Sequence, residues 1–308
     1  MKGESVLYAL AGVGLILLLF LSTHWLGPLG AFTNMLAAFP VAYLTLRFGL
    51  VTGGTTLLLA ASAVWFLAGL TPLISYLGLF GAPSLCLPWL LGRAKPWDLA
   101  IFKSTLVGLG LAGVLLLAYL QVSGQTFGAL QERYLQAEID LAMQTYTAAG
   151  LSDSQLAELK VFATQAADFI RVTFVGLYVV GILAIHAVTL LVVHGFKGER
   201  WSIAGVAFAQ WHLPPQLVWV LIAAGFALLV PLPAAPLIGR NLLAVLLPLY
   251  FVQGLAVLSC FLHRKKWSSA IKWLVYFLVF ILNPLPLLVV GVGIFDLWID
   301  FRRPRPKV

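Results

Sequence analysis

Charged side chains are scarce in this sequence. Asp, Glu, Lys and Arg together make up 10% of the 308 residues, whereas hydrophobic residues make up 61%. Soluble globular domains carry about 25% charged residues. The composition therefore excludes an ordinary soluble domain and predicts a chain that folds in lipid.

Cysteine and catalytic motifs are equally sparse. Cys86 and Cys260 lie inside apolar runs, without a charged neighbour to activate the thiol. The sequence has no His-Glu-x-x-His motif, no Walker phosphate loop, no nucleophile elbow and no carboxylate cluster within an apolar run. We therefore expect no disulfide framework, no metal site, no cofactor and no enzymatic activity.

Long apolar runs are what the sequence has in abundance. A spanning helix needs roughly 20 mainly apolar residues, and these runs predict an all-α, polytopic membrane helix bundle of about ten transmembrane helices. The last two runs are either one helix broken at 283–286 or two short helices in a hairpin. The predicted spans are 6–25, 28–47, 50–70, 73–91, 99–121, 169–193, 216–231, 241–262, 268–283 and 285–301.

The basic residues orient this bundle, because Lys and Arg are retained on the cytoplasmic side. With ten spans and the N-terminus inside, only Arg133, Lys160, Arg171 and Arg240 fall outside. Nine spans would instead export the basic tail. This bias accounts for the net charge of +8 without nucleic acid, and it predicts a bacterial inner-membrane protein with both termini in the cytoplasm. The predicted cytoplasmic residues are Lys2, Arg47, Arg93, Lys95, Lys103, Lys197, Arg200, Arg264, Lys265, Lys266, Lys272, Arg302, Arg303, Arg305 and Lys307.

One hydrophilic stretch, 122–168, interrupts the apolar runs and divides the chain into two five-helix membrane halves, 1–121 and 169–308. Apolar residues recur in it at helical spacing, Gly150 is a plausible helix stop, and Ser152 with Gln155 matches a capping box. The sequence predicts a short extracytoplasmic hairpin of two amphipathic helices. These helices are too small to form a core alone.

Few polar residues lie within the predicted spans, and these are the candidates for binding a solute. Asn34 and Gln253 can either hydrogen-bond across helices or bind a polar ligand, and the sequence leaves both alternatives open. His186 lies deep in the sixth predicted span, where a neutral imidazole can bond a neighbouring helix or relay a proton.

Ionisable residues near the predicted cytoplasmic ends form a second group: Arg47, Lys103, Lys272 and Asp296. Long basic side chains there can reach the headgroups. Asp296 is the fourth candidate for solute binding, but residues 300–303 can supply it with a salt partner. A structural ion pair is therefore the default interpretation.

Small residues one helical turn apart let membrane helices approach closely. Such pairs are Ala38 with Ala42 and Gly49 with Gly53. They are candidates for helix packing or for docking a partner. Prolines inside the apolar runs can kink helices and open carbonyls toward a cavity, which suits transport.

Several segments resemble the YybS-like family of bacterial polytopic membrane proteins. They are 39–53, with its Pro40, Arg47 and Gly49, and the carboxy-terminal segments 211–214, 239–243, 250–256 and 293–302. That family is considered distantly similar to the S-components of energy-coupling-factor transporters, which capture vitamins or metal ions in a bundle of about six helices. The resemblance implies binding of a small-molecule solute, with Ala38 and Ala42 as a docking face.

Two functions follow as hypotheses. The leading one is a transporter-type, solute-binding bundle that relies on a membrane or ATPase partner subunit, since the chain has no nucleotide-binding motif of its own. The alternative is a non-transporting membrane scaffold or regulatory partner protein, which the scarcity of buried polar residues favours. Both hypotheses place the protein in the lipid bilayer, and neither involves nucleic acid.

Overall fold

The computed structural model describes residues 3–22, 26, 28–196, 201–265 and 267–303. Within these ranges the chain is helical and contains no strand, which confirms the all-α fold class. The predicted span end at Trp25 lies outside the described residues, as do six of the basic residues used for orientation. Those six are Lys2, Lys197, Arg200, Lys266, Arg305 and Lys307.

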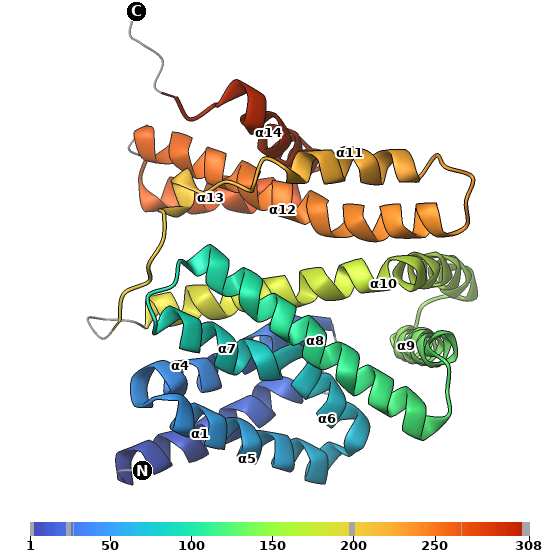
Figure 1. The fold of residues 1–308 in the computed structure, drawn as a ribbon. Helices are drawn as coiled ribbons and strands as arrows, with labels where there is room; N and C mark the ends of the chain where they lie inside the picture. The colour runs from blue at the N-terminus through green and yellow to red at the C-terminus, as the bar shows by residue number, and fades with distance from the viewer. Residues whose placement is uncertain (1–2, 23–25, 27, 197–200, 266, 304–308) are drawn as a thin grey trace, which may run out of the picture. The chain divides into compact units, whose positions relative to one another are not determined.

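The chain divides into two compact units. Unit 1 is Met1–Glu138 with Gly181–Gly205, and unit 2 is Ile139–Val180 with Val206–Val308. The helices, coloured along the chain in Figure 1, are α1 (Gly3–Phe20), α3 (Pro28–Asn34), η1 (Met35–Ala38), α4 (Phe39–Phe48), α5 (Leu50–Ala68), α6 (Leu70–Tyr76), η2 (Leu77–Gly81), α7 (Ala82–Leu91), α8 (Trp97–Ser123), α9 (Phe127–Ala148), α10 (Asp153–Gly195), η3 (Phe208–Gln210), α11 (Leu217–Ala227), α12 (Ala234–Arg264), α13 (Ser269–Ile281) and α14 (Leu285–Ile299).

Six helical stretches are long and apolar enough to cross a membrane: α1, α5, Leu70–Leu91, α8, α10 and α12. Counting the bent pair of α13 and α14 as one span raises the number to seven. The prediction of about ten spans is therefore wrong for the part of the chain that is described. A helical membrane bundle is still what these apolar helices form.

The missing spans are short or broken helices. The run 28–47 is interrupted by the 3-10 turn η1, which ends just before Pro40; the proline ring lacks an N–H and would collide with the carbonyl of Leu36 in a regular helix. Helix α11 has 11 residues, or about 16 Å, against the roughly 30 Å of a bilayer core. The chain bends by 104° between α13 and α14, so neither is a full span by itself.

The stretch 122–168 contains the two predicted helix segments, the end of one near Gly150 and the start of the other at Ser152. Helix α9 ends before Gly150, whose φ of +82° favours glycine, and the capping box forms: the Ser152 N–H donates to Gln155 Oε1 at 3.0 Å. The boundary at 168 is not a helix end, however. Helix α10 runs for 43 residues through it, and Asp168 and Arg171 make an ion pair of 3.0 Å within that helix.

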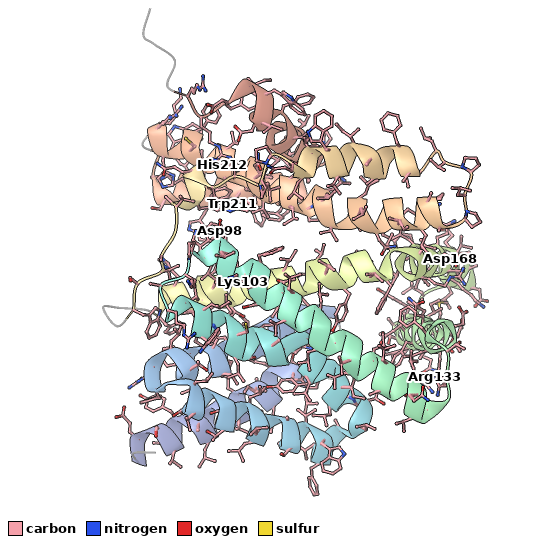
Figure 2. All side chains as sticks on the ribbon, viewed as in Figure 1. Asp98, Lys103, Arg133, Asp168, Trp211 and His212 are labelled. Atoms are coloured by element: carbon pink, nitrogen blue, oxygen red, sulfur yellow. The ribbon has the colours of Figure 1, made fainter. Side chains whose placement is uncertain are left out.

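The core of unit 1 lies where α4 packs against α1, α5 and α7. Gly49 separates α4 from α5 with a φ of +94°, and a Cβ at Gly53 would overlap the Thr45 side chain. At the start of α8, the Trp97 N–H donates to the Ala204 carbonyl at 2.9 Å, and Asp98 accepts from Leu99 in the first turn (Figure 2).

The core of unit 2 is the crossing of α12 with α14, which Figure 1 shows side by side. Glycines make this crossing close: a Cβ at Gly254 would overlap the Val289 carbonyl, and a Cβ at Gly293 would overlap the Tyr250 carbonyl. Helix α11 packs on the other part of α12 beside Gly239. Backbone contact of this kind is available only to the smallest residues.

Candidate functional site

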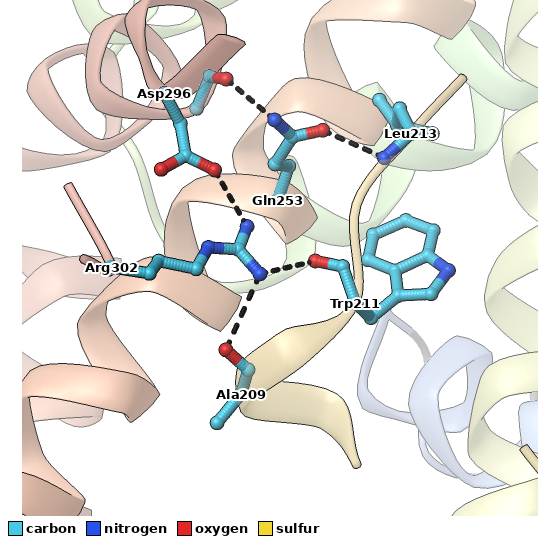
Figure 3. A network of polar contacts seen from close by, with 7 residues as sticks. Ala209, Trp211, Leu213, Gln253, Asp296 and Arg302 are labelled. Atoms are coloured by element: carbon cyan, nitrogen blue, oxygen red, sulfur yellow. Dashed lines mark hydrogen bonds and ion pairs between the residues drawn. The ribbon is translucent and has the colours of Figure 1, made fainter. Parts of the chain in front are cut away.

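Gln253 lies at the centre of a polar network in unit 2 (Figure 3). Its side chain is buried on α12; Oε1 accepts from the Leu213 N–H at 2.9 Å, and Nε2 donates to the Gly293 carbonyl at 2.9 Å. The amide therefore holds the extended segment before α11 and helix α14 to α12. The sequence left open whether Gln253 bonds across helices or binds a polar ligand. The observed geometry is that of hydrogen bonds across elements.

Asp296 lies in the same network and pairs with Arg302. Arg302 Nη2 lies 2.8 Å from Asp296 Oδ2, and both side chains are nearly buried, with 11% and 7% exposed. Arg302 Nη1 also donates to the carbonyls of Trp211 at 2.7 Å and Ala209 at 3.3 Å (Figure 3). The predicted salt partner is present, and Asp296 has the geometry of a structural ion pair.

The network joins segments that carry the resemblance described above. The segment of Trp211 and His212, labelled in Figure 2, supplies a carbonyl and the Leu213 N–H; α12 supplies Gln253; and α14 with its following turn supplies Asp296 and Arg302. Asp296 Oδ1 and Arg302 Nε have no hydrogen-bond partner among the described residues, and Arg302 Nη2 has only its ion pair.

His186 belongs to a different cluster, in unit 1. It is fully buried on α10; its Nδ1 lies 2.8 Å from the Ile182 carbonyl and 3.3 Å from Thr105 Oγ1 on α8. Thr189, one turn farther along α10, is also buried, as is Ser104 beside Thr105. We call these four residues, Ser104, Thr105, His186 and Thr189, the α8–α10 polar cluster.

The register of the two helices places the cluster at one level. A Cβ at Gly108 would contact Ile182, Thr105 contacts His186, and Leu190 packs on the apolar cluster that contains Ala100. The helices therefore run antiparallel, with Thr105 and His186 at the same level. Ser104 Oγ, His186 Nε2 and Thr189 Oγ1 have no hydrogen-bond partner among the described residues.

Asn34, the remaining candidate, lies at the junction of α3 and η1. Its Oδ1 is buried and without a hydrogen-bond partner in the described ranges, whereas the nearby hydroxyls of Ser22 and Thr33 contact each other at 2.6 Å. The four predicted binding residues thus fall in three places. Gln253 and Asp296 are brought together, and among the described residues no hydrogen bond joins Asn34 to His186.

The predicted packing residues lie inside unit 1. Ala38 and Ala42 are 0% and 1% exposed, so neither offers a surface on which a partner could dock. Gly53 allows the close approach of α4 and α5 at Thr45, and Gly49 forms the turn between these helices. These four small residues have the geometry of internal helix packing.

The sequence did not single out Asn241, Ser104 or Thr189 as candidate site residues. Asn241 was noted only as the start of a span and as part of the resembling segment 239–243, yet its Oδ1 accepts from the Gly176 N–H and its Nδ2 donates to the Val172 carbonyl, both at 2.8 Å. The feature of the sequence that could have identified Asn241 is a polar amide side chain within an otherwise apolar run. The hydroxyls of Ser104 and Thr189 gave no comparable signal, because hydroxyl residues are common in membrane helices.

The described residues contain no group of three or more His, Cys, Asp and Glu side chains that could hold a metal ion. The polar clusters described above therefore offer hydrogen bonds and one ion pair rather than a metal centre. A groove of about 160 Å³ along α1 and α4 has an apolar lining and contains none of the four candidates.

Comparison with known proteins gives one match. No curated protein and no solved structure matched the chain. The profile of a family described as "Predicted membrane protein (DUF2232)" matches residues 14–297, which include both units' helical cores and nearly all of the chain. With its apolar helices, the chain is a multi-pass membrane protein, and it belongs to the DUF2232 family of predicted membrane proteins.

Proposed function

We propose that this protein is a membrane-embedded solute-binding protein of transporter type, and that the α8–α10 polar cluster contacts a small polar solute. The observation that carries the proposal is the set of three buried, unpartnered polar atoms: Ser104 Oγ, His186 Nε2 and Thr189 Oγ1. An unsatisfied buried polar group costs about 1–3 kcal/mol. A bound molecule with donors and acceptors would remove that cost.

The size of unit 1 supports the proposal. Besides the first half of α9, its described residues form six helical segments: α1, the α3–η1–α4 stretch, α5, the α6–η2–α7 stretch, α8 and the end of α10. The S-components, to which the YybS-like family is distantly similar, have about six helices. The resemblance and this count together favour a solute-binding role for unit 1.

Energy for transport would come from another subunit. The chain has no phosphate-binding loop that could hold ATP, so purified protein is expected to show no ATPase activity. A docking surface for such a partner would lie on exposed residues, since Ala38 and Ala42 are buried.

We propose the bacterial cytoplasmic membrane as its location, with both termini in the cytoplasm and 122–168 outside. Arg47 supports part of this topology, because its ion pair of 2.9 Å with Glu4 brings the start of α1 and the end of α4 to one side. Arg47 itself, in the last turn of α4, favours the cytoplasm as that side.

The alternative function is a non-transporting scaffold or regulatory partner. Unit 2 favours this alternative, because both polar atoms of the Gln253 amide are hydrogen-bonded to backbone groups and Asp296 forms an ion pair with Arg302. A bundle whose polar side chains are all structural would have nothing left with which to bind a solute.

The test compares two chemically identical substitutions. Thr189→Val removes an unpartnered hydroxyl of the cluster, whereas Thr56→Val removes a buried hydroxyl that already donates to the Thr52 carbonyl at 2.8 Å. Each full-length variant would be purified from native membranes in mild detergent, with mass spectrometry of retained small molecules and proteins.

We expect wild-type protein and Thr56→Val to retain the same polar solute and Thr189→Val to lose most of it. Retention of no solute by the wild type, together with reproducible recovery of non-transport proteins, would favour the scaffold. Equal solute retention by the two variants would show that the α8–α10 polar cluster does not contact the solute.

A further inference from the structure

The groove between α1 and α4 in unit 1 is a second feature, independent of the polar cluster. Four residues at helical spacing on α1 form one wall, and four on the facing side of α4 form the other. Its lining is Tyr8, Ala11, Gly12, Leu15, Phe39, Pro40, Tyr43 and Leu44. The groove has an apolar lining and opens at the surface of the helices.

The missing side chain of Gly12 keeps the groove open. A Cβ at Gly12 would lie 2.9 Å from the Leu44 side chain, so larger residues would close the space between the helices. Tyr8 and Leu15 are partly exposed along the same face of α1. An occupant of this groove would be apolar and narrow, and it would remain in contact with the surroundings of the helices.

A cation closes one end of the groove. The Arg47 guanidinium lies 4.3 Å from the ring centre of Tyr8 on one wall, and its Nη1 donates to the Tyr43 hydroxyl on the other wall at 3.1 Å. Its Nη2 pairs with Glu4, whose side chain is 62% exposed. Arg47 thus joins both walls at the start of α1 and the end of α4.

We propose that this groove binds an anionic phospholipid, with one acyl chain between α1 and α4 and the headgroup phosphate at Arg47. The apolar lining matches a hydrocarbon chain, and the guanidinium complements a phosphate, with which arginine forms paired hydrogen bonds. The exposed Glu4 carboxylate is the group with which the phosphate competes. The aromatic rings of Tyr8 and Tyr43 fit the boundary between chain and headgroup.

Native mass spectrometry of the full-length protein in detergent would test this proposal, with phosphatidylglycerol and phosphatidylcholine of identical acyl chains as probes. We expect one phosphatidylglycerol molecule to be retained at concentrations where phosphatidylcholine is not. Arg47→Gln should weaken retention about fivefold, the size expected for one basic residue at a membrane surface. Glu4→Gln should strengthen it.

Matched controls separate the headgroup from the groove. Arg93→Gln removes another arginine, whose guanidinium lies 3.9 Å from the ring centre of Trp89. Arg93 does not line the groove, so this substitution should leave lipid retention unchanged. Ala11→Phe fills the groove from an exposed position and should reduce retention of both lipids, whereas Leu10→Phe adds the same ring on the exposed surface outside the lining.

Equal retention of the two lipids by the wild type, or unchanged retention in Arg47→Gln, would overturn the headgroup assignment and with it the proposal. Lipid binding that Ala11→Phe leaves intact would also overturn it. A second copy of the chain that occupies the groove would appear as a dimer that Ala11→Phe dissociates, and that result would replace the lipid.

Discussion

In unit 2, the buried Gln253 and the half-buried Asn241 each use both the oxygen and the nitrogen of the side-chain amide to bond backbone groups of other segments. Arg302 there binds two carbonyls as well as Asp296. In unit 1, His186 contacts Thr105 and a carbonyl of its own helix, while its Nε2 has no partner among the described residues. The two units therefore use buried polarity differently. In unit 2 the polar side chains hold the backbone in place, although Asp296 Oδ1 and Arg302 Nε also have no hydrogen-bond partner among the described residues. In unit 1 the α8–α10 polar cluster bonds no backbone of a second helix in the described ranges and leaves three of its atoms without a partner there.

The difference matters because lipid offers no substitute for a missing hydrogen bond. A satisfied amide fixes the elements that it joins. An unsatisfied group lowers stability and persists where something else selects for it. Substitutions in the two units should therefore have opposite effects on stability.

The largest effect is expected at the α12–α14 crossing. Gly293→Ala would drive a Cβ into the Tyr250 carbonyl, and neither backbone can move without separating the helices. We expect a loss of more than about 4 kcal/mol in the free energy of unfolding, measured by thermal unfolding in detergent. Gly291→Ala is the control on the same helix, because a Cβ there meets nothing within 4 Å. Equal loss in both variants would mean that the crossing is not tight.

Breaking the buried ion pair should come next. Arg302→Leu leaves Asp296 unpaired and should destabilise the protein by about 3–5 kcal/mol, whereas the double variant with Asp296→Leu should recover much of that loss. Arg303→Leu is the control, since Arg303 and its partner Asp300 are both exposed and the expected loss is below about 1 kcal/mol. No recovery in the double variant would argue that Arg302 acts through its carbonyl bonds alone.

Removing the central amide of unit 2 should have a somewhat smaller effect. Gln253→Leu keeps a buried side chain of similar length but leaves the Leu213 N–H and the Gly293 carbonyl without partners. Each unsatisfied group costs about 1–3 kcal/mol, and the burial of an apolar leucine side chain offsets part of the sum, so we expect a loss of about 2–4 kcal/mol in thermal unfolding measurements. A neutral result would show that water or lipid headgroups reach this network.

The smallest effect should have the opposite sign. Thr189→Val in unit 1 replaces an unpartnered hydroxyl with a methyl group of equal size, and it should raise the stability of the solute-free protein by about 1 kcal/mol. Thr56→Val loses a satisfied hydrogen bond and should be neutral or slightly destabilising. Destabilisation by Thr189→Val would erase the distinction between the two units.

Much of the fold could be predicted from the sequence, since apolar runs define helices that lipid can solvate. The capping box at Ser152, the turn at Gly150 and the ion pair of Asp296 with Arg302 are examples in which local spacing was sufficient. The number of spans was not predictable in this way. Hydropathy measures how apolar a run is, whereas the η1 turn before Pro40 and the bend after α13 decide whether the run is one straight helix.

For the candidate site, the sequence predicted the residue types but not their partners. Gln253 and His186 both stand out as polar residues in apolar helices, and nothing in their local sequence separates a satisfied amide from an unsatisfied imidazole. The spacing of Ala38 and Ala42 predicted close helix contact. Only their burial in the structure shows that these contacts are within the chain rather than with a partner.

By itself, the sequence determined that this protein is a multi-pass helical membrane protein. With 61% hydrophobic and 10% charged residues, most of the helix surface is apolar and is solvated by lipid rather than by water. The tertiary structure decided how its few polar groups are used, since a hydrogen bond depends on which segment lies opposite the side chain. Gln253 meets the backbone of α14 and of the segment before α11. The α8–α10 contact pairs His186 with Thr105 but leaves His186 Nε2, Ser104 Oγ and Thr189 Oγ1 without hydrogen-bond partners among the described residues. Distances along the chain do not encode either arrangement.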